Sequence, residues 1–209
     1  MTSNKVLLST TYFGPVQWYQ KLHRAELVTI EQWESFQKQT YRNRCLIATT
    51  QGVQALTVPV EKPTDNGTPY YIKDLRISDH GNWRHLHWNA LQSAYGESPF
   101  FEYYQDDIRP FFEERWTYLV DFNEAIRQKM CELIDFLPNV TYSNTYIADA
   151  QTAGIADYRA AIHPKHPVQD DDFTPKTYYQ VYQMKHGFLK NLSILDLLFN
   201  MGPESVFYL

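Results

Sequence analysis

The chain has 209 residues, of which 44% are hydrophobic, with a formal net charge of -5 and two cysteines. A globule of this length removes roughly 70% of its unfolded surface from water, so a single domain over residues 1–209 is expected to build its core without disulfides or metals. The acidic balance argues against nucleic acid as a main ligand, and the scarcity of cysteine indicates a reducing compartment, most simply the cytoplasm.

The first predicted elements form a strand, helix, strand unit. Residues 5–10 are apolar and β-branched, Gly14-Pro15 interrupts them, and residues 16–24 are amphipathic. A second apolar run at 27–30 predicts another strand, so the two strands should lie parallel and be joined by a crossover. The N-terminus lacks the pattern of a secretory signal, and no apolar run approaches the ~18 residues of a membrane span.

A β-hairpin is predicted next. Residues 45–50 and 53–60 are β-rich and flank Gln51-Gly52, a two-residue turn signal. Residues 61–69 are rich in turn formers, and residues 72–77 alternate like a further strand. Parallel and antiparallel pairing together predict a mixed, partly parallel sheet.

The hydrophobic period then changes to that of helices. A helix is predicted from Trp83, with Asn82 as its N-cap and Gly96 as its stop. A second helix should begin at Ser98-Pro99, where a proline without an N–H is tolerated, and should end or kink at Pro110.

The second half of the chain continues this helical pattern. One apolar stripe predicts the longest helix over residues 114–136, followed by a short strand within 139–148 and a surface loop over 163–175. In the last helix, Ser193 and Asp196 have the spacing of a reciprocal capping box. The predicted fold class is therefore α/β, with a mixed, partly parallel sheet flanked by helices and a helical second half.

Polar side chains gather between the second and third predicted strands. Arginine forks bind carboxylate or phosphate with two hydrogen bonds, and a neighbouring carboxylate can hold the fork or act as a base. The alternative is a solvated loop with ordinary ion pairs. The residues concerned are Glu31, Glu34, Lys38, Tyr41, Arg42, Asn43 and Arg44.

Other candidate groups are more isolated. His87 lies on the apolar stripe of its helix and is either a general base or a hydrogen-bonded core residue. Cys45 enters a strand, which favours a buried, inert thiol over a nucleophile. His163 and His166 lack a third ligand, so no metal site is predicted.

Aromatic residues are abundant, with 16 Tyr, 12 Phe and 5 Trp. Such a surplus forms either an aromatic-rich core or surfaces that stack on sugars. Tyr179 and Gln180 precede the last helix. Their hydroxyl and amide groups either form hydrogen bonds with a sugar or pack within the fold. The usual motifs of nucleotide-binding, hydrolase and zinc proteins are absent from the sequence.

Three segments together resemble the WbqC-like family. They are Leu7 to Pro15, Lys38 to Arg44, and Gly187-Phe188 with Leu192 to Pro203, and Trp83-x-x-x-His87 also fits. The resemblance spans nearly the whole chain and is most specific in the last segment. It implies a role in the biosynthesis of cell-surface polysaccharide of the O-antigen type, without a settled reaction or cofactor.

The leading hypothesis is a cytoplasmic transferase that acts on a sugar or sugar-nucleotide intermediate. His87 and Glu31 are its candidate catalytic groups, and the site is expected at the carboxyl ends of the strands. The rivals are a non-catalytic module that binds a glycan or a partner, and a Cys45-dependent hydrolase. The candidate substrate-binding residues are Tyr12, Gln17, Lys38, Arg42, Asn43, Arg44, Tyr179 and Gln180.

Overall fold

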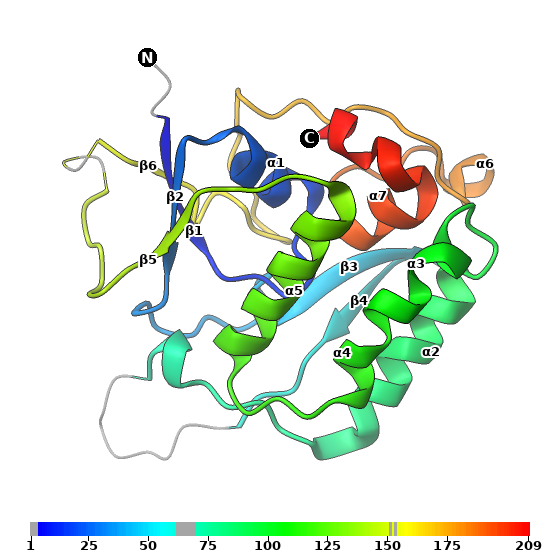
Figure 1. Ribbon diagram of the computed structural model, residues 1–209, viewed down its shortest axis with the longest axis horizontal. Helices are drawn as coiled ribbons and strands as arrows, with labels where there is room; N and C mark the ends of the chain where they lie inside the picture. The colour runs from blue at the N-terminus through cyan, green and yellow to red at the C-terminus, as the bar shows by residue number, and fades with distance from the viewer. Residues whose placement is uncertain (1–3, 62–69, 151, 153) are drawn as a thin grey trace.

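A four-stranded parallel sheet occupies one end of the molecule (Figure 1). The computed structural model describes residues 4–61, 70–150, 152 and 154–209. The strand order is β5-β2-β1-β6, and each neighbouring pair runs parallel. The strands are β1 (Lys5–Ser9), β2 (Leu27–Glu31), β5 (Val140–Tyr142) and β6 (Ala156–Asp157).

The unit β1–α1–β2 confirms the first predicted motif, with α1 spanning Val16–Arg24. Alternate residues of the strands point to one face because successive side chains of a strand alternate. Val6 and Leu8 of β1, with Val28 of β2, join the main hydrophobic core on that face. The sheet is thereby fixed in register on its buried side.

The predicted hairpin forms a separate antiparallel sheet of β3 (Arg44–Thr49) and β4 (Gly52–Thr57). Thr49 pairs with Gly52, so the two-residue turn is Thr50-Gln51, one position earlier than predicted. Gly52 has φ = +103°, a conformation that favours glycine. Both parallel and antiparallel strands are therefore present, as the predicted fold class required, but in two sheets.

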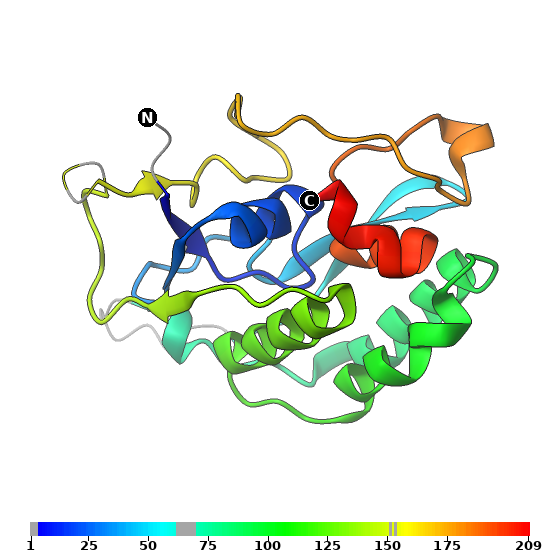
Figure 2. The same ribbon diagram turned by 45° about the horizontal axis from the view of Figure 1, so that its top comes forward.

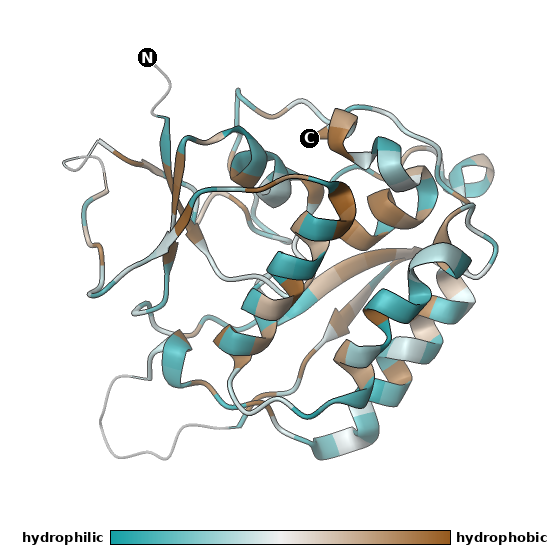
Figure 3. Ribbon diagram, in the orientation of Figure 1, coloured by the Kyte–Doolittle hydropathy of each residue, from teal (hydrophilic) through white to brown (hydrophobic). Residues whose placement is uncertain are grey.

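Helices fill the space between the sheets and cover the hairpin (Figures 1 and 2). Figure 3 shows that the strands and α7 are largely hydrophobic, whereas hydrophilic residues lie along the outer turns of the other helices. The core is rich in aromatic rings, including the fully buried Tyr12, Phe13 and Phe122. The helices are α2 (Trp83–Tyr95), α3 (Phe101–Ile108), α4 (Pro110–Glu113), α5 (Leu119–Ile134), α6 (Gln183–His186) and α7 (Ile194–Met201).

The strand predicted over residues 72–77 was wrong. Ile72–Asp74 is a 3₁₀ helix, and Arg76 and Ile77 make isolated bridges to Tyr118 and Val60. Ile72, Leu75 and Ile77 are all buried, so the segment packs on the core without a continuous strand partner. The turn-rich segment predicted at 61–69 lies, apart from Glu61, outside the described residues.

The long helix begins later than predicted, because the extended backbone before Leu119 bonds to the segment around residue 76. The reciprocal capping box was also wrong, since the Asp196 N–H donates to the Ser193 carbonyl and not to its side chain. Ser193 caps α7 by accepting from the Leu195 N–H, whereas the Ser193 N–H donates to the carbonyl of Leu46. Asn82, the predicted cap of α2, makes no side-chain capping bond.

Candidate functional site

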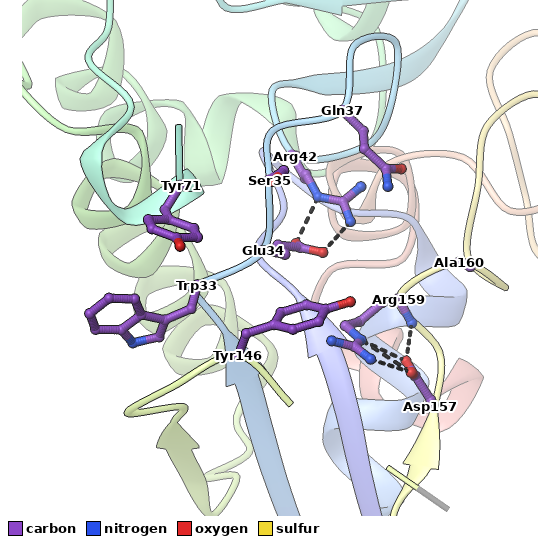
Figure 4. A pocket seen from close by; sticks show the side chains of 10 residues that line it. All are labelled: Trp33, Glu34, Ser35, Gln37, Arg42, Tyr71, Tyr146, Asp157, Arg159 and Ala160. Atoms are coloured by element: carbon purple, nitrogen blue, oxygen red, sulfur yellow. Dashed lines mark hydrogen bonds and ion pairs between the residues drawn. The ribbon is translucent and has the colours of Figure 1, made fainter. Parts of the chain in front are cut away.

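A cavity of about 510 Å³ lies beyond the carboxyl ends of the parallel strands (Figure 4). Its walls come from the segment after β2, from the segments after β5 and β6, and from the turn before Ile72. We call this cavity the strand-end crevice. The residues that line it are Trp33, Glu34, Ser35, Gln37, Arg42, Tyr71, Tyr146, Asp157, Arg159 and Ala160.

The topology explains why a crevice forms there. The chain moves from β1 to β2 and β5 on one side, then returns to place β6 on the other side of β1. The loops that leave β1 and its neighbours diverge at such a point, which is the usual ligand site of an open α/β sheet. The location agrees with the expectation from the sequence.

A buried ion pair forms one wall of the crevice. Arg42 Nε donates to Glu34 Oε1 at 2.7 Å and its Nη2 donates to Ser9 Oγ at 2.8 Å. A second bond from Nη2 to Glu34 makes the pair bidentate, and the two side chains are only 4% and 8% exposed. A paired, buried guanidinium of this kind is held rigidly, so this wall is preorganised.

A second guanidinium faces the first across the crevice (Figure 4). Arg159 binds Asp157 through both Nε and Nη2, with an Nη2–Oδ2 distance of 2.6 Å. Its guanidinium carbon lies 5.2 Å from the centre of the Tyr146 ring. Asp157 is the last residue of β6, Arg159 follows that strand, and Tyr146 follows β5.

Glu31, a predicted catalytic carboxylate, lies beneath the crevice and is fully buried. It accepts hydrogen bonds from the backbone N–H groups of Trp33 and Ile147 and from Ser143 Oγ at 2.6 Å. It also lies 3.4 Å from Arg159 Nη1. These bonds join the loops that follow three strands, so Glu31 holds the walls of the crevice in position.

Aromatic faces complete the crevice. Trp33 and Tyr71 meet edge to face with their centroids 5.6 Å apart, and Figure 4 shows Tyr146 opposite them. Tyr146 is 54% exposed, so its ring is available to a ligand. Flat apolar rings beside hydrogen-bonding groups suit a sugar, which has apolar faces and polar edges.

His87 lies in the aromatic core instead. Its Nδ1 is 2.9 Å from the Tyr12 hydroxyl, and its ring contacts Trp83 edge to face. Burial lowers the pKa of His87 to about 4, so the imidazole is neutral at neutral pH. Neither His87 nor Tyr12 is among the lining residues of the crevice in the described part of the chain.

The neighbours of Arg42 also point elsewhere. Asn43 Nδ2 donates to the carbonyl of Val58, and Arg44 Nε donates to Thr57 Oγ1 at 3.0 Å, so both brace the hairpin. Lys38 is exposed on the loop. Of the groups expected to converge, Arg42 lines the crevice, whereas Arg44 and His87 are absent from its described lining.

The remaining predicted residues lie in other parts of the molecule. Gln17 is buried on α1 and lines a second cavity with its Nε2 2.8 Å from Asp170. Gln180 is buried and donates to Asp196 Oδ2 at 2.8 Å, whereas Tyr179 is 53% exposed. The structure therefore brings few of the sequence-predicted residues together.

The thiols and imidazoles examined as alternatives are structural in character. Cys45 is buried and burial raises the pKa of its thiol, which disfavours the nucleophilic thiolate. His163 accepts backbone N–H bonds at Nδ1 from Lys165 and His166. Within the described ranges, no three His, Cys, Asp or Glu side chains are arranged to hold a metal ion.

Several lining residues escaped the sequence analysis. Asp157 ends a strand of two residues and Arg159 follows it, and such a strand is too short to leave a periodic pattern. Tyr71 lies before a segment predicted as a strand, and Tyr146 lies within a predicted strand segment. A search for polar and aromatic residues directly after each apolar run would have found Trp33.

Comparison with known proteins tests the family resemblance of the sequence. A sequence model of the WbqC-like protein family matches residues 10–208. The uncharacterized protein Rv1507c of Mycobacterium tuberculosis is 29% identical over 195 residues, which cover 83% of each chain. No solved structure is significantly similar to this chain. Among the described residues, no helix has both the length and the apolarity to cross a bilayer.

Proposed function

This chain belongs to the WbqC-like protein family, and we propose that it is a transferase acting on a sugar or sugar-nucleotide intermediate of cell-surface polysaccharide biosynthesis. The substrate site in this proposal is the strand-end crevice. The pathway is the one that the family resemblance implies. Both cysteines are free and buried, which suits the reducing cytoplasm as the site of action.

The observation that carries the proposal is the meeting of two guanidinium–carboxylate pairs and three aromatic rings in one crevice. A sugar ring would stack on Tyr146 or Trp33. Each carboxylate oxygen of Glu34 accepts one bond from Arg42 and keeps a second lone pair, so Glu34 can accept a hydrogen bond from a sugar hydroxyl. Arg42 and Arg159 fix the directions of the Glu34 and Asp157 carboxylates.

A second candidate function is a non-catalytic module that binds the same kind of sugar. It is favoured by the pairing of both lining carboxylates, Glu34 and Asp157, with guanidinium groups. A general base needs an accessible lone pair and a suitable pKa. In such a module, the two ion pairs contribute to recognition of the sugar, and the bound sugar is released without chemical change.

Calorimetric titration with a panel of sugar nucleotides tests the shared site. Tyr146→Ala removes an exposed ring, and Arg159→Gln removes the guanidinium that holds Asp157. We expect each variant to weaken binding on the order of tenfold, because a lost stacking face or charged hydrogen bond is worth about 1.5 kcal/mol. Tyr103→Ala and Arg109→Gln are matched surface controls and should bind normally.

Binding that is unaffected by both crevice variants would place the sugar elsewhere and end the proposal. Turnover separates the two candidate functions. A transferase consumes the donor when a tightly bound sugar nucleotide is incubated with a panel of acceptors and followed by mass spectrometry. A module binds the donor and leaves its mass unchanged across that panel.

A further inference from the structure

A second cavity, of about 580 Å³, lies next to the strand-end crevice. Tyr41 lines the second cavity and the adjacent Arg42 lines the crevice. The segment after β6 is shared in the same way, since Ala160 lines the crevice and His163 lines the second cavity. The two cavities therefore border the same two chain segments, which a hydrogen bond from Lys165 to Gln39 joins.

Much of the wall of the second cavity is apolar. The apolar side chains come from the loop before α6, from β3 and from the residue before Ser193. An apolar ligand group that lies against this wall is removed from water, which favours binding by about 25 cal/mol per Å² of buried apolar surface. The apolar lining includes Leu46, Pro167, Val168, Phe173, Pro175 and Leu192.

The side-chain oxygens on its inner wall are already engaged. Asp170 accepts from Lys21 at 2.7 Å and from Gln17 at 2.8 Å. Gln17 Oε1 accepts from Asn191 Nδ2, and Asn191 Oδ1 accepts from the Gln17 N–H. Asp170 therefore has little capacity left to accept hydrogen bonds from a ligand, and the amide oxygens of Gln17 and Asn191 each already hold one donor.

Three other lining residues offer hydrogen-bond donors, namely Tyr41, Lys190 and His163. The Tyr41 ring is 6% exposed, and its hydroxyl makes no hydrogen bond with any described residue. The Lys190 ammonium is exposed and forms no ion pair within the described residues. His163 uses Nδ1 as an acceptor, so its neutral ring carries the proton on Nε2.

We propose that this cavity binds an amphipathic anion, with an acyl or isoprenoid-type chain on the apolar wall and a phosphate head at Tyr41, His163 and Lys190. Three donors without acceptors call for an oxygen-rich, negatively charged head. If the crevice holds the sugar donor, as the proposed function has it, the neighbouring cavity holds the second substrate. A transferase that transfers a group directly between two bound substrates holds them in adjacent sites of this kind.

Decyl phosphate below its micelle concentration is the probe, measured by calorimetry with the intact protein. Inorganic phosphate supplies the head alone, and decanol supplies the chain alone. We expect decyl phosphate to bind at least tenfold more tightly than either, and its affinity to fall with added salt. Decanoate, with a carboxylate head, tests whether phosphate is preferred.

Tyr41→Phe and Lys190→Gln should each weaken decyl phosphate binding roughly tenfold, because each removes a hydrogen bond to a charged group. Tyr103→Phe and Lys129→Gln are the matched controls. Val168→Glu places a negative charge at a position that is 60% exposed, so it should abolish binding without unfolding the chain. Circular dichroism checks the fold of every variant.

Decyl phosphate that binds no more tightly than decanol, or equally well to all three cavity variants, overturns the proposal. The sugar arm stays separate because Tyr146→Ala is expected to leave decyl phosphate binding intact. If Tyr146→Ala loses sugar binding and the unmodified protein does not bind decyl phosphate, the proposal for the second cavity is refuted and the proposal for the crevice is retained. The reverse pattern refutes the crevice.

Discussion

Two buried titratable residues respond to pH in opposite directions. Asp196 is fully buried and accepts hydrogen bonds from Tyr95, Tyr178 and Gln180, with no cation among these partners. Burial raises the pKa of Asp196 to about 6 despite these three donors. Burial lowers the pKa of His87 to about 4. The folded state thus favours the neutral form of both side chains.

Asp196 should make the protein less stable as pH rises. Its pKa in the unfolded chain is near 3.8, so its stabilising contribution is complete below that value and is lost as pH rises through about 6. The loss is about 3 kcal/mol. We expect Asp196→Asn to gain this amount relative to the unmodified protein between pH 3.8 and 7, in urea unfolding. Asp106→Asn, on an exposed helix face, should show no such gain.

His87 should do the reverse. Its pKa is near 6.5 when unfolded, so its contribution is present above pH 6.5 and is lost as pH falls through about 4. Relative to His87→Gln, the unmodified protein should lose about 3 kcal/mol of unfolding free energy over that range. His85→Gln, at an exposed position of α2, is the control. An NMR titration that places the His87 pKa near 6.5 would contradict the prediction.

The candidate site was only partly predictable at this scale. Arg42 could be selected because it follows the second strand within a polar segment, and the structure places it in the crevice. Its neighbours Asn43 and Arg44 share the segment but brace the hairpin. Direction within an irregular loop depends on partners distant in sequence, such as Val58 and Thr57, which spacing along the chain does not reveal.

At the scale of elements, α1 holds the long loop that lines the second cavity. Figures 1 and 2 show the segment from β6 to α6 running along one side of the molecule. Lys21 of α1 pairs with Asp170 of that loop, and both side chains are 6% exposed. Gln20 Nε2 also donates to the carbonyl of Asp172. A loop without regular structure is thereby fixed to a helix.

Breaking this ion pair from one side should be costly. Lys21→Met leaves the Asp170 carboxylate buried and unpaired, and we expect a loss of roughly 3 kcal/mol in urea unfolding. The double variant Lys21→Met with Asp170→Leu should recover much of that loss. Arg109→Met, which opens an exposed pair with Glu113, should cost under about 1 kcal/mol. Equal losses in the buried and exposed cases would contradict this account.

The elements themselves were largely predictable where a period was long enough. The strand, helix, strand unit and α2 follow the predicted pattern because one face of each is buried. Residues 72–77 alternate in hydrophobicity but pair with no strand in the described part of the chain, where they form a 3₁₀ turn and single bridges. The Asp196 side chain does not form the predicted capping bond because three buried donors outcompete the backbone N–H of Ser193.

At the scale of the whole molecule, one hydrophobic core includes residues from the parallel sheet, the hairpin and the helices. We therefore propose that the chain folds as the single domain predicted from the sequence. We expect one unfolding transition, with far-ultraviolet circular dichroism and tryptophan fluorescence giving the same midpoint. Trp18 lies on α1 and Trp83 on α2, so the fluorescence reports on separate regions. Two distinct midpoints would indicate two domains.

The position of β6 has a consequence for synthesis. Ala156 pairs with Val6 near the start of the chain, and Asp157 and Arg159 complete the crevice beside it. A nascent chain therefore exposes β1 with one edge open until these residues leave the ribosome. The crevice can be assembled only after that moment, so a polypeptide released before residue 157 would carry the Arg42 wall without Asp157 and Arg159 of the wall that faces it.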